Sequence, residues 1–169
     1  MEPAEALSAS AQVAIALAGF AGVVVAFRNR SVHEWSNIDK FRLRILLANS
    51  VTPFVLSILS MVLASANLDP PTTWRLCSLF TFILLVAIGS RYRVIFQRFF
   101  PQEEFKISGA RRLIFNVASW FAIAVTLLQL YNVISLQAFW PFFAAIATFL
   151  VLAMLQFVLL VTVHDGAKS

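Results

Sequence analysis

Apolar residues occur in five long runs along this chain, and polar residues gather between them. No Asp, Glu, Lys, Arg or His lies in the middle of any run. A helix needs about 20 apolar residues to cross the hydrocarbon of a bilayer, and a central charge is costly there. The pattern therefore predicts an all-α integral membrane bundle of five transmembrane helices. The predicted spans are 7–27, 45–66, 74–95, 113–134 and 138–163.

The second helix is expected to be longer than its apolar run. Ser36 precedes Asp39 by three residues, which is the spacing of a capping box, so the helix is expected from Asn37 to Ala66. At 1.5 Å per residue its length is about 45 Å, against about 30 Å of hydrocarbon. Its first turns should extend into the cytoplasm, and Pro53 predicts a kink where it interrupts the hydrogen-bond ladder.

Polar residues and prolines also mark the ends of the later helices. Thr72 or Thr73 is expected to cap the third helix, whose basic last turns should extend into the cytoplasm until Pro101 ends it. Gln102 to Gly109 is then expected to form a loop. A tight uncharged turn at 135–137 should join the fourth and fifth helices.

Positive charge is concentrated on one side of the predicted spans. Of the thirteen Lys and Arg residues, only Arg75 lies outside 28–44, 91–112 and the extreme C-terminus. Cytoplasmic loops of membrane proteins carry an excess of Lys and Arg. Five spans with the N-terminus out and the C-terminus in place both basic stretches inside.

The first run has a flank that is unusual for a targeting signal. Glu2 and Glu5 precede it and no Lys or Arg does, whereas a secretory signal peptide has a positive flank before its apolar stretch. We therefore expect an uncleaved span. The alternative is a first segment that re-enters or lies on the membrane surface.

Composition excludes several classes of protein. With 60% hydrophobic and 12% charged residues, the chain is too apolar for a water-soluble domain. Its single cysteine, Cys77, excludes an internal disulfide. His33 lies near Glu34 and Asp39, but the set is too loose for a metal site. We therefore expect no metal and no cofactor. We also expect no nucleic-acid partner, because membrane topology explains the net charge of +5.

The first predicted span carries small residues at every fourth position. Such spacing lets another helix approach the backbone closely. The partner could be another helix of this chain, or a second copy in an oligomer or narrow pore. The small-residue stripe comprises Ala6, Ser10, Ala14, Ala18, Gly22 and Ala26, and Gly19 and Gln12 are further candidates for helix packing or for lining a pore.

A cationic collar surrounds the predicted cytoplasmic ends of the spans. Its members would set topology and contact anionic lipid headgroups. Alternatively, they would form a vestibule that attracts anions if several subunits surround an axis. The main candidates are Arg28, Arg30, Arg42, Arg44, Arg91, Arg93, Arg111 and Arg112.

Amide side chains lie inside the predicted spans at two depths. Asn49, Asn116 and Gln156 are each one to two turns from the cytoplasmic boundary, and Gln12 and Gln129 are at a comparable depth from the outer one. An amide in hydrocarbon needs a hydrogen-bond partner. These residues are interpreted either as bonds between helices or as the lining of a polar path.

Two segments carry a resemblance. Residues 16–24 read ALAGFAGVV, and 39–47 read DKFRLRILL. In this order they resemble a pattern of small bacterial multi-pass membrane proteins of unassigned function. The resemblance covers the first third of the chain and implies a setting in the bacterial inner membrane. It implies no activity, substrate or site residue.

The range of possible functions is narrowed mainly by the residue types that are absent from the predicted spans. Without a carboxylate or histidine in mid-span, transport coupled to protons or sodium is disfavoured, and no catalytic motif indicates an enzyme. The favoured hypothesis is a passive ion channel, formed by several copies with the first span nearest the axis and a cationic cytoplasmic mouth. The alternative is a non-catalytic structural or accessory subunit of a larger membrane complex.

Overall fold

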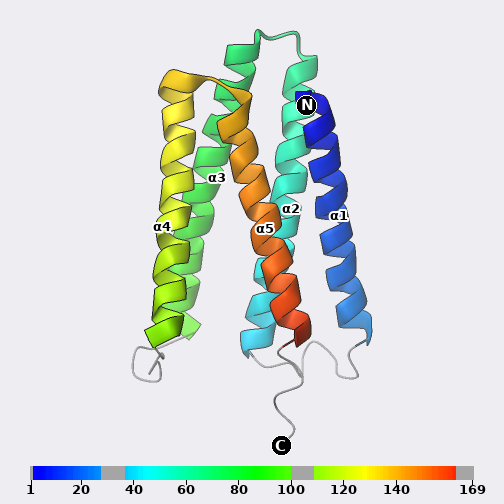
Figure 1. Ribbon diagram of the computed structural model, residues 1–169, viewed down its shortest axis with the longest axis vertical. Helices are drawn as coiled ribbons and strands as arrows, with labels where there is room; N and C mark the ends of the chain where they lie inside the picture. Colours follow the sequence, from blue (N-terminus) through cyan, green and yellow to red (C-terminus); the bar gives the residue numbers. More distant parts are fainter. Residues whose placement is uncertain (1, 28–36, 100–108, 163–169) are drawn as a thin grey trace, which may run out of the picture. The chain divides into compact units, whose positions relative to one another are not determined.

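The computed structural model describes residues 2–27, 37–99 and 109–162, with side chains at 2–27, 40–41, 43–91 and 120–158. Over these ranges the chain is all-α, as predicted, and contains no strand. The elements, drawn in Figure 1, are α1 (Pro3–Phe27), α2 (Asn37–Ser65), α3 (Pro70–Phe99), α4 (Gly109–Tyr131), the π-helical turn η2 (Asn132–Leu136) and α5 (Phe139–Thr162).

Four of the described helices are long and apolar enough to cross a membrane by length and composition. The stretches concerned are Pro3–Phe27, Leu43–Ser65, Pro70–Arg91 and Phe139–Val158. The described apolar part of the α4 region, Trp120–Leu136, is shorter. Four of the predicted spans are thus matched by helices of sufficient length. The fourth span, in α4, stays a prediction, as do the orientation and the insertion of all five.

The chain divides into two compact units, of which the first is Met1–Asn67 together with Phe143–Ser169. Within it α1 packs against α2. Leu17 and Ala21 of α1, Leu46 of α2 and Ala153 of α5 form one buried cluster, so these three helices share a core. Pro53 lies inside α2, which continues on both sides of it. The predicted bounds of α2 differ from the observed ones only at its end, Ser65 in place of Ala66.

The second unit is Leu68–Phe142. In it α3 packs against both α4 and η2, while the first residues of α5 complete the unit. The indole of Trp74 lies 4.9 Å from the ring of Phe139 and 6.3 Å from the ring of Phe142, measured between ring centroids. These aromatic contacts tie the beginning of α3 to the beginning of α5.

The N-terminal cap of α3 differs from the sequence-based expectation. The helix begins at Pro70, and the carboxylate of Asp69 accepts a hydrogen bond of 3.1 Å from the backbone N–H of Thr72. The hydroxyl of Thr73 donates to the backbone carbonyl of Asp69. The expectation that Thr72 or Thr73 would be the cap is therefore wrong. Asp69 has that role because proline suits the first helical position, where no N–H is required.

Helix α4 ends at Tyr131, and the π-helical turn η2 that follows it overlaps the predicted turn at 135–137. The backbone N–H of Gln137 donates to the carbonyl of Asn132 over 2.9 Å, which closes the turn five residues back. Gln137 has a φ of 49°, a left-handed conformation that ends the helical path. The chain then enters α5 at Phe139.

Candidate functional site

The small-residue stripe of α1 is buried only in its first half. Ala6, Ser10 and Ala14 are buried, and the hydroxyl of Ser10 donates to the carbonyl of Ala6 within the same helix. Ala18 is half-buried, and Gly22 and Ala26 are exposed. The stripe therefore does not run along a single buried face.

Helix geometry explains this departure. A step of four residues turns about 400°, so a four-residue repeat drifts by about 40° at each step. Most buried positions of α1 instead alternate steps of three and four, which keeps them on one side of the helix. The positions in this series are Leu7, Ser10, Ala14, Leu17 and Ala21, and the two other buried residues, Ala6 and Ala11, lie directly beside it.

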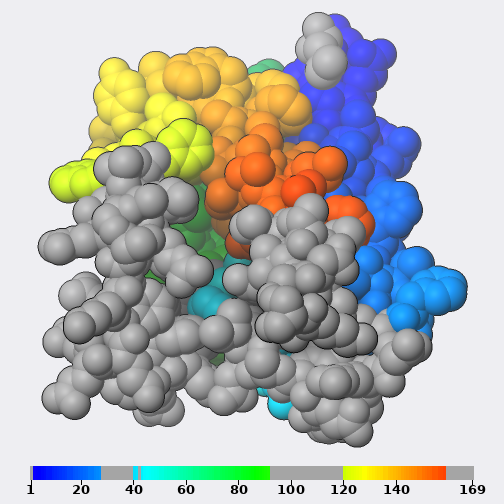
Figure 2. All heavy atoms as spheres, turned by 60° about the horizontal axis from the view of Figure 1, so that its bottom comes forward, coloured from blue at the N-terminus to red at the C-terminus, as the bar shows by residue number. Residues whose placement is uncertain are grey.

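The opposite side of α1 is open. Gln12, Ile15, Gly19, Gly22 and Ala26 follow the same alternation of three and four, and all five are exposed. A Cβ atom added at Gly19 or Gly22 would meet nothing within 4 Å. Figure 2 shows side chains of α1, in blue, at the surface. We call these five residues the open face of α1.

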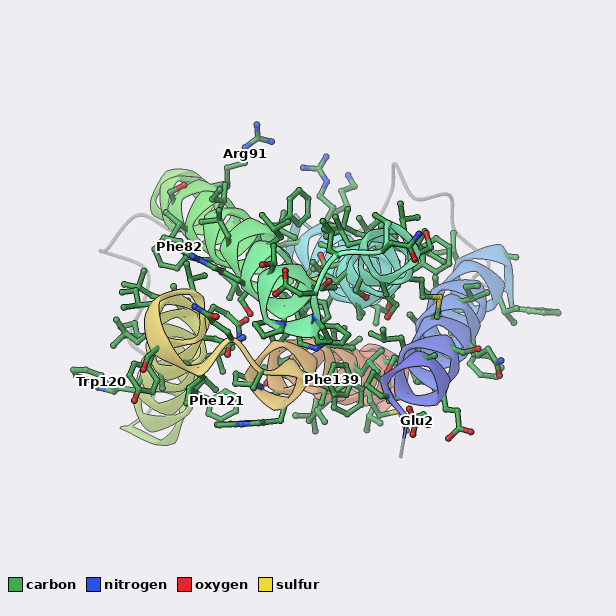
Figure 3. The ribbon with its side chains drawn as sticks, turned by 90° about the horizontal axis from the view of Figure 1, so that it is seen from above. Glu2, Phe82, Arg91, Trp120, Phe121 and Phe139 are labelled. Atoms are coloured by element: carbon green, nitrogen blue, oxygen red, sulfur yellow. The ribbon has the colours of Figure 1, made fainter. Side chains whose placement is uncertain are left out.

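Of the eight arginines named for the predicted cationic collar, two have described side chains. Arg44 of α2 and Arg91 of α3 are both exposed, and Figure 3 shows Arg91 pointing away from the helices. The remaining members lie outside the described residues, or in helices at positions whose side chains are not described. Arg28 and Arg30 belong to the first group, and Arg42, Arg93, Arg111 and Arg112 to the second.

One pair of predicted intramembrane amides is brought together. The Nδ2 atom of Asn49 in α2 donates to the Oε1 atom of Gln156 in α5 over 3.1 Å. Asn49 is buried and Gln156 is half-buried. The side chain of Asn116, which was predicted at the same depth, lies outside the described residues. The observed bond is a link between two helices of the first unit.

The other predicted amides have different surroundings. Gln12 lies on the open face of α1. Gln129 of α4 is fully buried, and its Nε2 atom donates to the backbone carbonyl of Pro141 in α5 over 2.7 Å. Gln129 thus also links two helices, through backbone and not through a second side chain.

The most extensively bonded amide, Asn132, was missed by the sequence reasoning. Its Nδ2 atom donates to the hydroxyl oxygen of Ser78 at 2.6 Å and to the carbonyl of Ala138 at 3.0 Å. Its Oδ1 atom accepts a bond of 3.0 Å from the N–H of Ala138. In a sequence, an amide beside a turn is the signal for such a clamp. Asn132 stands at the polar end of an apolar run, however, where solvent is an equally good hydrogen-bond partner.

Few titratable side chains come together in the part of the chain that the structure describes. No group of three or more His, Cys, Asp or Glu residues that could hold a metal ion occurs among them. The buried polar residues are hydroxyls and amides, and several of the hydroxyls bond carbonyls one turn earlier in their own helices. Comparison with protein-family models, with curated proteins and with solved structures finds no match to this chain.

Proposed function

We propose that this chain is an integral membrane protein that assembles with copies of itself through the open face of α1 and forms a passive ion channel. The proposal is supported first by the four helices of membrane-spanning length. It is supported further by the large apolar side chains that are exposed on all five helices. They include Phe20, Val51, Ile83, Trp120 and Val151. Lipid is the solvent in which such surfaces are stable.

The open face of α1 is the observation that best supports the proposal of a channel. It combines glycines with an exposed amide, Gln12, and its backbone is free of neighbours at Gly19 and Gly22. A helix of this kind can approach a second copy closely or stand beside a narrow aqueous lumen. The proposed lumen would lie between subunits arranged around a symmetry axis.

The cationic collar would form the cytoplasmic mouth. Exposed Arg44 and Arg91 occupy the ends of the apolar stretches of α2 and α3, where they meet either anionic headgroups or permeating anions. We place the protein in the inner membrane of a bacterium, on the resemblance of its first third, and with its basic stretches in the cytoplasm.

A second candidate function is a non-catalytic accessory subunit of a larger membrane complex. The observation that favours it is that Asn49, Gln129 and Asn132 bond to groups of their own units. Amides used in this way act as structural bonds between helices. The open face of α1 would then contact a helix of another protein.

Native mass spectrometry of the purified protein in lipid nanodiscs separates the two functions. The channel predicts a uniform oligomer that Gly22→Leu converts to monomers, whereas Ala9→Leu, which adds similar bulk at an exposed position beside the open face, leaves it intact. A wild-type monomer, or stable copurification with other membrane proteins, would favour the accessory role.

Ion flux into liposomes then tests conduction. Arg44→Gln should lower the preference for anions, because it removes a cation from the proposed mouth. Arg75→Gln, at an exposed position near the opposite end of the spans, is the matched control. Equal selectivity in the wild type and both variants would exclude the collar as a filter.

A further inference from the structure

Helix α3 has an exposed apolar side opposite its buried residues. Cys77, Ser78 and Thr81 are buried, and Ser78 accepts the bond from Asn132 on that side of the helix. With 3.6 residues per turn, a set of exposed residues lies within about 60° of Ile83, on the other side. Ile83 itself has 57% of its surface exposed. We call this set the exposed face of α3, and it comprises Leu79, Phe80, Ile83, Val86, Ala87 and Ser90.

A cation stands at the inner end of this face. Arg91 is about 80° from Ile83 around the helix, so it borders the exposed face. Its side chain is exposed, and Figure 3 shows it pointing away from the helices. The apolar stretch Pro70–Arg91 ends at the same residue. Because α3 contains no Asp or Glu, its own helix offers no carboxylate to neutralise the charge.

The length of the face between Phe80 and Arg91 matches one leaflet of a bilayer. Eleven residues at 1.5 Å each span about 16 Å, and half of the hydrocarbon thickness is about 15 Å. Between Arg91 and the larger apolar residues lie Ala87 and Ser90, whose small side chains leave the helix surface open near the charge. The order along the helix is therefore a cation, a low surface and an apolar strip of one acyl-chain length.

We infer that the exposed face of α3 binds an anionic phospholipid of the cytoplasmic leaflet. The phosphate contacts the guanidinium of Arg91, and an acyl chain lies along Ile83 towards Phe80. A free anion would match the charge and leave the apolar strip uncovered. A second copy of the chain, inserted in the same direction and packed through this face, would bring a second Arg91 to the same depth, where the like charges repel.

The inference rests on the membrane placement in the proposed function, with the basic stretches in the cytoplasm. It requires neither the oligomer nor the channel. It assigns Arg91 to lipid and leaves Arg44 as the described cation of the proposed mouth.

Fluorescence quenching at a single site tests this occupant. Val86→Cys, with Cys77 replaced by Ser, carries a bimane fluorophore on the exposed face, and the full chain is placed in liposomes that contain a nitroxide-labelled phospholipid. Labelled phosphatidylglycerol should quench at about one fifth of the mole fraction that labelled phosphatidylcholine requires, because one arginine near the surface favours an anionic lipid roughly fivefold. Equal quenching by the two lipids would overturn the inference.

Two variants of α3 show whether Arg91 is responsible. Arg91→Gln should abolish the preference for phosphatidylglycerol. Arg75→Gln, at an exposed position near the other end of the same helix, is the matched control and should keep it. A preference that survives Arg91→Gln unchanged would refute a headgroup at this residue.

Other occupants give different results in the same experiment. A preference that disappears when inorganic phosphate replaces chloride at constant ionic strength would overturn the inference in favour of a free anion. Absence of quenching by either lipid would show that protein covers the face. Failure of the proposed channel is read separately: a monomeric wild type in native mass spectrometry would remove the channel and leave the lipid preference unchanged.

Discussion

The side-chain amide of Asn132 donates a hydrogen bond of 2.6 Å to the hydroxyl oxygen of Ser78, which joins η2 to α3. The same amide bonds both the N–H and the carbonyl of Ala138, so one side chain satisfies the backbone at the turn and fixes the neighbouring helix. Both polar atoms of the Asn132 side chain are hydrogen-bonded. The clamp explains why a polar residue occupies a fully buried position in an apolar unit.

Asn132→Ala should destabilise the second unit strongly. The substitution leaves the backbone groups of Ala138 without their side-chain partners in a buried environment, at a cost of about 2–4 kcal/mol. Unfolding in mixed detergent micelles measures this change. Thr126→Val is the comparison, and a similar stability for both variants would show that the clamp contributes nothing.

The bond between Asn49 and Gln156 should be worth a measurable coupling energy. Leu at either position removes one partner, and Leu at both replaces the pair by apolar contact. A double-mutant cycle is expected to give about 0.6–2 kcal/mol, the range of single hydrogen bonds between helices in membranes. A coupling energy of zero would mean that the two amides have separate partners. It would contradict the hydrogen bond that joins α2 to α5 in the first unit.

Adding bulk to the two sides of α1 should have opposite effects on folding. Ala21 is fully buried against α2 and α5, so Ala21→Leu should destabilise the folded subunit by about 1–3 kcal/mol through overpacking. Gly22 has open space around it, and Gly22→Leu should increase stability by up to about 1 kcal/mol through helix propensity. The measurement is unfolding of each variant under conditions that keep the subunit monomeric. Equal destabilisation would place Gly22 in the core of the subunit.

The start of α3 should depend on acid. The backbone N–H of Thr72, and then its side chain, donate to Asp69 and hold the pKa of that carboxyl below its ordinary value of 3.8. The ionised cap therefore contributes stability above about pH 4, which is lost as the pH falls through the lower folded pKa. Asp69→Asn keeps a capping oxygen without the titration. The difference in melting temperature between wild type and this variant should change below pH 4, and a constant difference would exclude Asp69 as the acid-sensitive cap.

The apolar runs predicted most of the secondary structure. The observed α2 ends one residue before its predicted end, and α5, Phe139–Thr162, lies one residue inside the predicted limits at each end. Such boundaries are local: a proline, a charge or a polar turn marks each one. The start of α3 was misjudged because two threonines were preferred as caps over Asp69, although the prolines that follow Asp69 indicate the first helical turn.

The candidate site was harder to predict, because it depends on which side of a helix meets a neighbour. A repeat of four residues looked like one face of α1, but it drifts around the helix and leaves Gly22 on the open side. Amides could be placed by depth, and Asn49 does meet Gln156. Their partners could not be assigned, because packing between distant segments is not encoded in local spacing. Asn132 shows the same limit, since its partner Ser78 is 54 residues away.

Transmembrane topology is the property on which the proposed function depends most directly. A single cysteine at Leu68, in the turn between α2 and α3, with Cys77 replaced by Ser, should react with a membrane-impermeant maleimide added outside intact cells. A fluorescent reporter fused to the C-terminus should fold in the cytoplasm. Labelling of Leu68→Cys only after the membrane is opened, or a C-terminus on the same side as the N-terminus, would contradict the five-span arrangement and the cytoplasmic cationic mouth.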